Sequence, residues 1–143
     1  MGTLIVVDCE APFGVGSPSV GDMTEFGAVD VNALRQGREE TFHGLYCTEE
    51  TFRRFREWLE PRKPVVFVSD YPAYDFQWIN FYFWRYFGMN PFGHSGRRIA
   101  DFLRRASWRF SKDAELEASS PNEARSSSGA RRTRERRGAD SPV

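Results

Sequence analysis

Hydrophobic runs alternate with turn-forming segments along the first part of the chain. Residues 3–8 form a nearly continuous apolar run in which β-branched residues are common. Such a run is typical of a central strand that is covered on both faces. A segment rich in glycine, proline and serine follows at residues 11–22, and two further strand-like runs occupy residues 25–31 and 41–47. This order predicts a meander of three strands.

The spacing of apolar residues then changes to that of helices. Thr48 is a good N-cap, and the apolar side chains after it fall on one face until Pro61 ends the pattern. Residues 65–68 predict a fourth, interior strand. Residues 73–87 predict a second helix, so aromatic that no face is consistently polar. Three strands, a helix, a strand and a helix predict an α/β domain with a mixed sheet.

The charged and aromatic residues divide unevenly along the chain. The 143 residues include 20 Lys and Arg and 20 Asp and Glu, so the formal net charge is zero. Residues 1–102 hold 10 basic and 14 acidic side chains and 20 of the 22 aromatic ones, whereas residues 103–143 hold 10 basic and 6 acidic side chains. These numbers predict a domain over residues 1–102, followed by a basic, low-complexity tail that is expected to be disordered.

Several classes of protein are excluded by the same residues. No apolar stretch is long enough to span a bilayer, and no basic segment precedes the first apolar run, as a secretory signal would require. We therefore expect a cytoplasmic protein with no membrane partner. Cys9 and Cys47 lack the spacing of a zinc site or a disulfide framework, so both are expected to be buried or half-buried thiols.

Carboxylates are placed where they could bind a metal ion. Asp8 and Glu10 end the first predicted strand, and alternation puts both on one face while Cys9 points the other way. Ligands bind at the carboxyl ends of strands in open α/β sheets, and Mg²⁺ prefers oxygen ligands. A solvated turn is the simpler interpretation. Asp75, in the first turn of the aromatic helix, favours the metal site because an acid there needs partners or a cleft; Asp70 is a weaker candidate.

These motifs together resemble those of the DEDD superfamily of 3′-to-5′ exonucleases, which have a ribonuclease-H-like fold. Asp8 and Glu10 match the first motif, Asp-x-Glu, and Tyr74 and Asp75 match the ending of the second motif. The Asn that begins the second motif in the family has no counterpart here. The resemblance covers roughly residues 3–102 and implies a ribonuclease-H-like mixed sheet with flanking helices.

The resemblance also implies a reaction and its participants. Asp8, Glu10 and Asp75 would be catalytic residues that hold two Mg²⁺ or Mn²⁺ ions, one activating a water and the other stabilising the leaving oxygen. Tyr74 and Phe76 would be substrate-binding positions. The implied activity is 3′-to-5′ hydrolysis of phosphodiester bonds, with the 3′ end of RNA or single-stranded DNA as the nucleic-acid partner.

The third motif of the family, His-x-x-x-x-Asp, has no match. His43 lies in a predicted strand and is interpreted as structural, while His94 precedes Asp101 by seven positions rather than five. We therefore expect a C-terminally incomplete domain whose exonuclease activity is impaired. Loss of the last helix would expose aromatic surface on residues 73–87 and favour aggregation or a homodimer.

A shift of the reading frame near Leu103 is one hypothesis for the missing motif. With permitted codons, residues 124–132 read one base later give His-Asp-His-His-Pro-Val-Arg-Asp-Ala, which contains the motif. Resequencing the gene tests this hypothesis. The alternative is a native tail whose arginines at residues 131–137 contact nucleic acid nonspecifically.

Two other functions are compatible with the sequence. The first is a non-catalytic nucleic-acid-binding module that uses its cleft and its basic tail. The second is another metal-dependent phosphohydrolase, for which Asp8 and Glu10 would be sufficient.

Overall fold

Of the 143 residues, the computed structural model describes residues 1–105. Most of the predicted tail at residues 103–143 therefore lies outside the described residues, as do the shifted-frame segment at 124–132 and the arginines at 131–137. These remain predictions.

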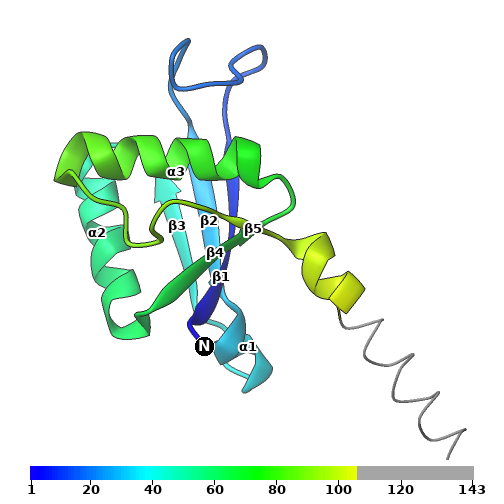
Figure 1. Cartoon of the computed structure of the whole chain (residues 1–143). Helices are drawn as coiled ribbons and strands as arrows, with labels where there is room; N and C mark the ends of the chain where they lie inside the picture. The colour runs from blue at the N-terminus through cyan, green and yellow to red at the C-terminus, as the bar shows by residue number, and fades with distance from the viewer. Residues whose placement is uncertain (106–143) are drawn as a thin grey trace, which may run out of the picture. The chain divides into compact units, whose positions relative to one another are not determined.

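The strands form one mixed five-stranded sheet, in the order β3-β2-β1-β4-β5 (Figure 1). β1 pairs antiparallel with β2 and β2 antiparallel with β3, so the predicted meander is confirmed. β1 pairs parallel with β4, and β4 pairs parallel with β5. The strands are β1 Thr3–Glu10, β2 Glu25–Asp30, β3 Thr41–Leu45, β4 Val65–Ser69 and β5 Arg97–Arg98.

The two long helices agree with the sequence pattern. The helical elements are α1 Val31–Arg35, α2 Glu49–Leu59, the 3₁₀ turn η1 Glu60–Arg62 and α3 Pro72–Phe87. The predicted N-cap of α2 is confirmed, since Thr48 Oγ1 accepts a hydrogen bond from the Thr51 N–H at 3.2 Å. α1 was not predicted. It forms because Asp30 caps it, accepting a bond from the Ala33 N–H at 2.9 Å.

Aromatic side chains from both long helices pack on one face of the sheet. Phe55 of α2 is fully buried, with its ring centroid 4.9 Å from that of Phe26 on β2 and 5.7 Å from that of Phe83 on α3. Strand residues Ile5 and Val7 belong to the same buried cluster. The fold is thus α/β with a mixed sheet and flanking helices, as predicted, and it is consistent with a ribonuclease-H-like arrangement.

A helical segment follows β5 at residues 99–105, within which the predicted domain boundary after Phe102 falls. The extent of the domain stays a prediction. No helix in the described part of the chain is both long and apolar enough to cross a membrane.

Candidate functional site

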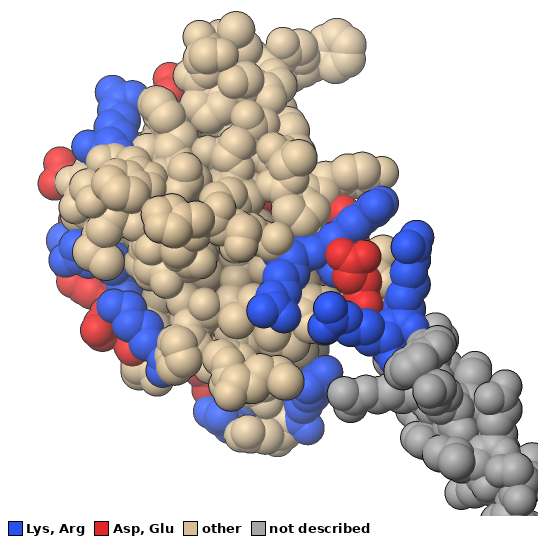
Figure 2. Space-filling model, in the orientation of Figure 1, with Lys and Arg blue, Asp and Glu red and all other residues tan. Residues whose placement is uncertain are grey.

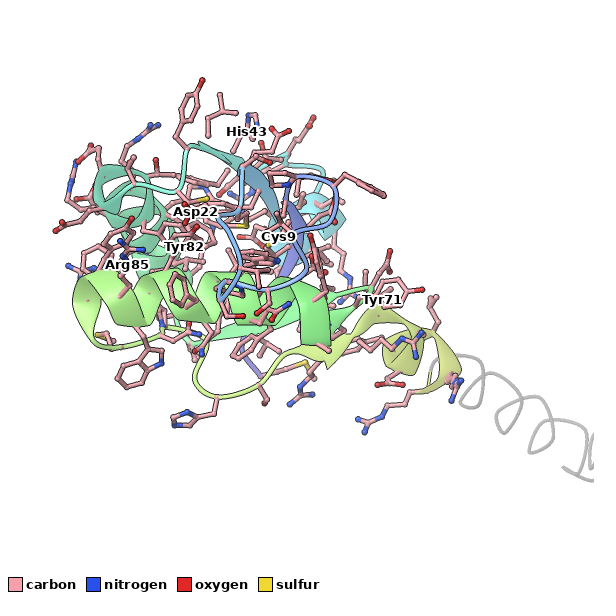
Figure 3. All side chains as sticks on the ribbon, turned by 90° about the horizontal axis from the view of Figure 1, so that it is seen from above. Cys9, Asp22, His43, Tyr71, Tyr82 and Arg85 are labelled. Carbon is pink, nitrogen blue, oxygen red and sulfur yellow. The ribbon has the colours of Figure 1, made fainter. Side chains whose placement is uncertain are left out.

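The carboxyl end of β1 alternates as predicted. Asp8 and Glu10 are exposed, whereas Cys9 between them is 3% exposed and belongs to the core. Figure 3 shows Cys9 among the packed side chains between the sheet and α3. Strand geometry therefore directs both carboxylates away from the aromatic core.

A second group of acids lies where β4 ends and α3 begins. The parallel pairing of β1 with β4 brings the carboxyl ends of the two strands to the same edge of the sheet. Asp70 directly follows β4, and Pro72 occupies the first turn of α3, where its missing N–H leaves no bond unmade. Asp75 completes that first turn and is 4% exposed.

One pocket of about 470 Å³ collects these residues. Its walls contain four carboxylates, from β1, from the loop after β4 and from α3, together with one cysteine and two tyrosines: Asp8, Cys9, Glu10, Asp70, Tyr71, Tyr74 and Asp75. The three predicted metal ligands are therefore brought into one pocket, and the weaker candidate Asp70 joins them.

Asp75 is tied to β1 by two hydrogen bonds. Its Oδ1 accepts a bond from the Cys9 N–H at 3.0 Å, and its backbone carbonyl accepts one from the Cys9 thiol at 3.5 Å. Residues 66 positions apart are thus held together at the pocket wall.

Burial raises the pKa of the Asp75 carboxyl, and the nearby charge of Asp8 raises it further. The hydrogen bond from the Cys9 backbone N–H acts in the opposite direction. The pKa of the Cys9 thiol is also raised, chiefly by burial and then by the charges of Asp75 and Asp8, so it stays protonated. An additional negative charge in the pocket is therefore unfavourable, and a bound cation would be favourable.

The donor set suits a hard divalent cation, because carboxylate oxygens are the ligands that Mg²⁺ and Mn²⁺ take. Within residues 1–105, no three carboxylate, histidine or cysteine side chains converge closely enough to hold one ion as they stand. Asp8 and Glu10 are exposed, and exposed side chains change rotamer freely. The residues therefore offer the type of ligand that such an ion prefers, and they line the same pocket.

The two predicted substrate-binding positions are placed differently. Tyr74 lines the carboxylate pocket. Phe76 does not line it, and packs instead edge-on against Phe67 of β4, with ring centroids 5.2 Å apart. In this structure, the Phe76 ring therefore packs against the sheet and is not part of the pocket lining.

The two histidines lie away from the pocket lining. His43 is on β3, on the far side of the sheet from α3 in Figure 3, and its Nε2 lies 2.8 Å from Glu25 Oε2. On β2, Gly27 pairs with Asp8 of β1 on one side and with His43 of β3 on the other, so one strand lies between the positions of His43 and Asp8. His94 lies in the exposed turn before β5.

A basic pocket that was not predicted lies next to the acidic one. Its volume is about 500 Å³, and its lining residues come from the start of α3, from β5 and from the helical segment after β5: Pro72, Gly96, Arg97, Arg98, Asp101, Phe102 and Arg105. The consecutive pair Arg97 and Arg98 is visible in the sequence. A strand of two residues, however, has no hydrophobic pattern from which its position in the sheet could be predicted.

Comparison with known proteins gives one relevant similarity. Over 70 residues the chain is 34% identical to an Escherichia coli protein named 3'-5' DNA exonuclease Cap18. This similarity supports a relationship to a nuclease. The aligned part takes in 44% of this chain and 37% of that protein, so the chain spans little more than a third of its relative's length. No family model matches the chain.

Proposed function

We propose that this domain is a metal-dependent 3′-to-5′ exonuclease acting on single-stranded DNA or RNA. The observation that carries the proposal is the meeting of Asp8, Glu10, Asp70 and Asp75 in one pocket at the ends of β1 and β4. The similarity to a protein named as a 3'-5' DNA exonuclease supports the same reaction and favours DNA as the substrate.

Asp8, Glu10 and Asp75 are the residues that would hold the metal, with Asp70 beside them. Divalent ions bound there would supply Lewis-acid stabilisation of charge on the phosphate oxygens. The Cys9 N–H fixes one Asp75 oxygen, so the orientation of this carboxylate is set by β1 before any substrate arrives. Tyr74 stands at the pocket wall, where it would contact the terminal nucleotide.

The test is degradation of a 5′-labelled oligonucleotide by the full chain in Mg²⁺ or Mn²⁺. We expect stepwise shortening from the 3′ end that stops in EDTA. Asp8→Asn and Asp75→Asn should each lower the rate on the order of a hundredfold or more, because a bound ion contributes several kcal/mol to the transition state.

Glu39→Gln is the matched control, since it removes an exposed carboxylate outside the pocket and should leave the rate unchanged. Degradation that persists in EDTA, or in both aspartate variants, would contradict the proposal. The absence of His-x-x-x-x-Asp predicts a slow wild-type rate compared with a frame-restored chain. Equal rates for the two chains would show that this motif is dispensable.

A further inference from the structure

Arginines gather at the sheet edge next to the carboxylates. The basic pocket contains Arg97 and Arg98 of β5 and Arg105 of the following helical segment, with Asp101 as its one acidic lining residue. Figure 2 shows basic side chains clustered on this side of the molecule, around an acidic one. Three positive charges against one negative charge give the pocket a net positive character.

The arginines that line this pocket form no ion pair with a carboxylate of the described residues 1–105. Arg38, Arg53 and Arg62 each form ion pairs with nearby acids. Within residues 1–105, neither Arg97 nor Arg98 nor Arg105 forms such a pair, and all three are exposed. Within that part of the chain no carboxylate occupies their donors, which leaves them able to bind an anion. Arginine is suited to phosphate, because its planar group can donate two parallel hydrogen bonds.

The basic and acidic pockets adjoin at two consecutive residues. Tyr71 lines the carboxylate pocket and Pro72 lines the basic one. The guanidinium of Arg98 lies over the Tyr71 ring, 5.8 Å from its centroid. In the sheet, Arg98 is paired with Ser69, the residue before Asp70.

Close packing at Gly96 holds the arginines in this place. A Cβ atom at position 96 would lie 2.7 Å from the Phe67 ring and 3.1 Å from Pro72 Cβ, so only glycine lets the chain approach α3 so closely. The next two residues are Arg97 and Arg98. The basic pocket is thus built against the first turn of α3, the turn that also carries Asp75.

We propose that Arg97, Arg98 and Arg105 bind the phosphodiester backbone of a single nucleic-acid strand whose 3′ end lies in the carboxylate pocket. This inference rests on the proposed exonuclease function and adds to it the path of the substrate. The strand runs from the acidic pocket, past Tyr71, onto the arginines. The contacts are to phosphates, so they carry no base preference.

The experiment measures binding of fluorescent oligo-dT and oligo-U to the full chain in EDTA by anisotropy, over a series of salt concentrations. Substitution of all three arginines by alanine should weaken binding about tenfold or more. It should also lower the slope of log affinity against log salt by roughly 2, since each phosphate contact on a single strand contributes about 0.7. The matched control is the triple variant Arg35→Ala, Arg38→Ala and Arg54→Ala, which removes the same charge from other exposed positions and should change binding much less.

A lysine version of the patch, R97K with R98K and R105K, should keep the salt slope while binding more weakly than wild type, because lysine retains the charge and loses the paired donors. Equal binding by the alanine variant and the wild type would overturn the proposal, as would failure of the wild type to bind either oligonucleotide. Tighter binding of one oligonucleotide identifies the backbone, DNA or RNA, that the patch prefers.

The two proposals fail in different ways. Wild-type chain that binds in EDTA through the arginines but does not shorten the oligonucleotide in Mg²⁺ or Mn²⁺ would overturn the exonuclease and leave the strand path standing. Arginine-independent binding with normal shortening would overturn the strand path alone.

Discussion

The middle turns of α3 and its first turn bury different kinds of side chain. In the middle, Tyr82 and Phe83 pack with Phe52 of α2, with ring centroids 5.1 and 5.2 Å from it. In the first turn, the buried side chain is the carboxylate of Asp75. One helix thus supplies apolar burial, which stabilises the fold, and a buried acid, which does not. The comparison predicts that substitutions in the two regions have effects of opposite sign on stability.

The largest effect is expected from the aromatic region. Phe55→Ala removes a ring with no exposed surface that contacts aromatic side chains from the sheet and both long helices. We expect it to lower the free energy of unfolding by about 3–5 kcal/mol, measured by urea denaturation. Leu34→Ala, at a side chain 53% exposed on α1, is the control and should cost about 0.5 kcal/mol or less. Similar losses for the two variants would contradict the assignment of stability to this core.

Tyr82→Phe should have an intermediate effect. The Tyr82 hydroxyl donates to Asp22 Oδ1 at 3.0 Å and accepts from the buried Met23 N–H at 3.2 Å, which ties the loop before β2 to α3. Phenylalanine keeps the ring and leaves that N–H unpaired, so we expect a loss of about 1–3 kcal/mol in the free energy of unfolding. Tyr46→Phe, at a side chain 77% exposed, should lose nothing measurable. An equally large loss in Tyr46→Phe would show that the two hydrogen bonds of the Tyr82 hydroxyl do not cause the loss of stability.

The smallest effect, and a stabilising one, is expected for Asp75→Asn without metal. Because the pKa of Asp75 is higher in the folded protein than in the unfolded chain, the folded state binds the proton more tightly. Stability from this group is present at low pH and is lost as the pH rises through the raised pKa. Asparagine removes the unfavourable charge and keeps an acceptor for the Cys9 N–H.

Thermal unfolding in EDTA checks this prediction. Asp75→Asn should melt a few degrees above wild type at neutral pH, and the difference should vanish below the ordinary carboxyl pKa of about 4. Added Mg²⁺ should raise the melting temperature of wild type and leave that of the variant unchanged. A lower melting temperature for the variant in EDTA would mean that ionised Asp75 stabilises the fold.

The sequence predicted the elements whose pattern is local. The apolar run at residues 3–8, the Thr48 cap and the aromatic helix each follow from neighbouring residues, and so does the shared face of Asp8 and Glu10. The identity of the metal and the roles of these carboxylates stay predictions, because they depend on a ligand.

Long-range features could not be predicted in the same way. Arg62 pairs with Asp30 across 32 positions, and Cys9 bonds Asp75 across 66. The basic pocket depends on a glycine packed against Phe67, a contact that no spacing in the sequence records. These contacts are set by how the strands pair, so they appear only once the sheet is assembled.

The buried thiol of Cys9 can be used to measure local opening of the fold. A thiol-specific reagent reaches Cys9 only when β1 separates from the first turn of α3, because the sulfur lies in the core and bonds the Asp75 backbone. Cys47 is half-buried and is therefore more accessible to the same reagent, although burial raises its pKa to about 12 and so slows its reaction. The ratio of the two labelling rates reports how often the carboxylate pocket comes apart while the rest of the fold stays intact.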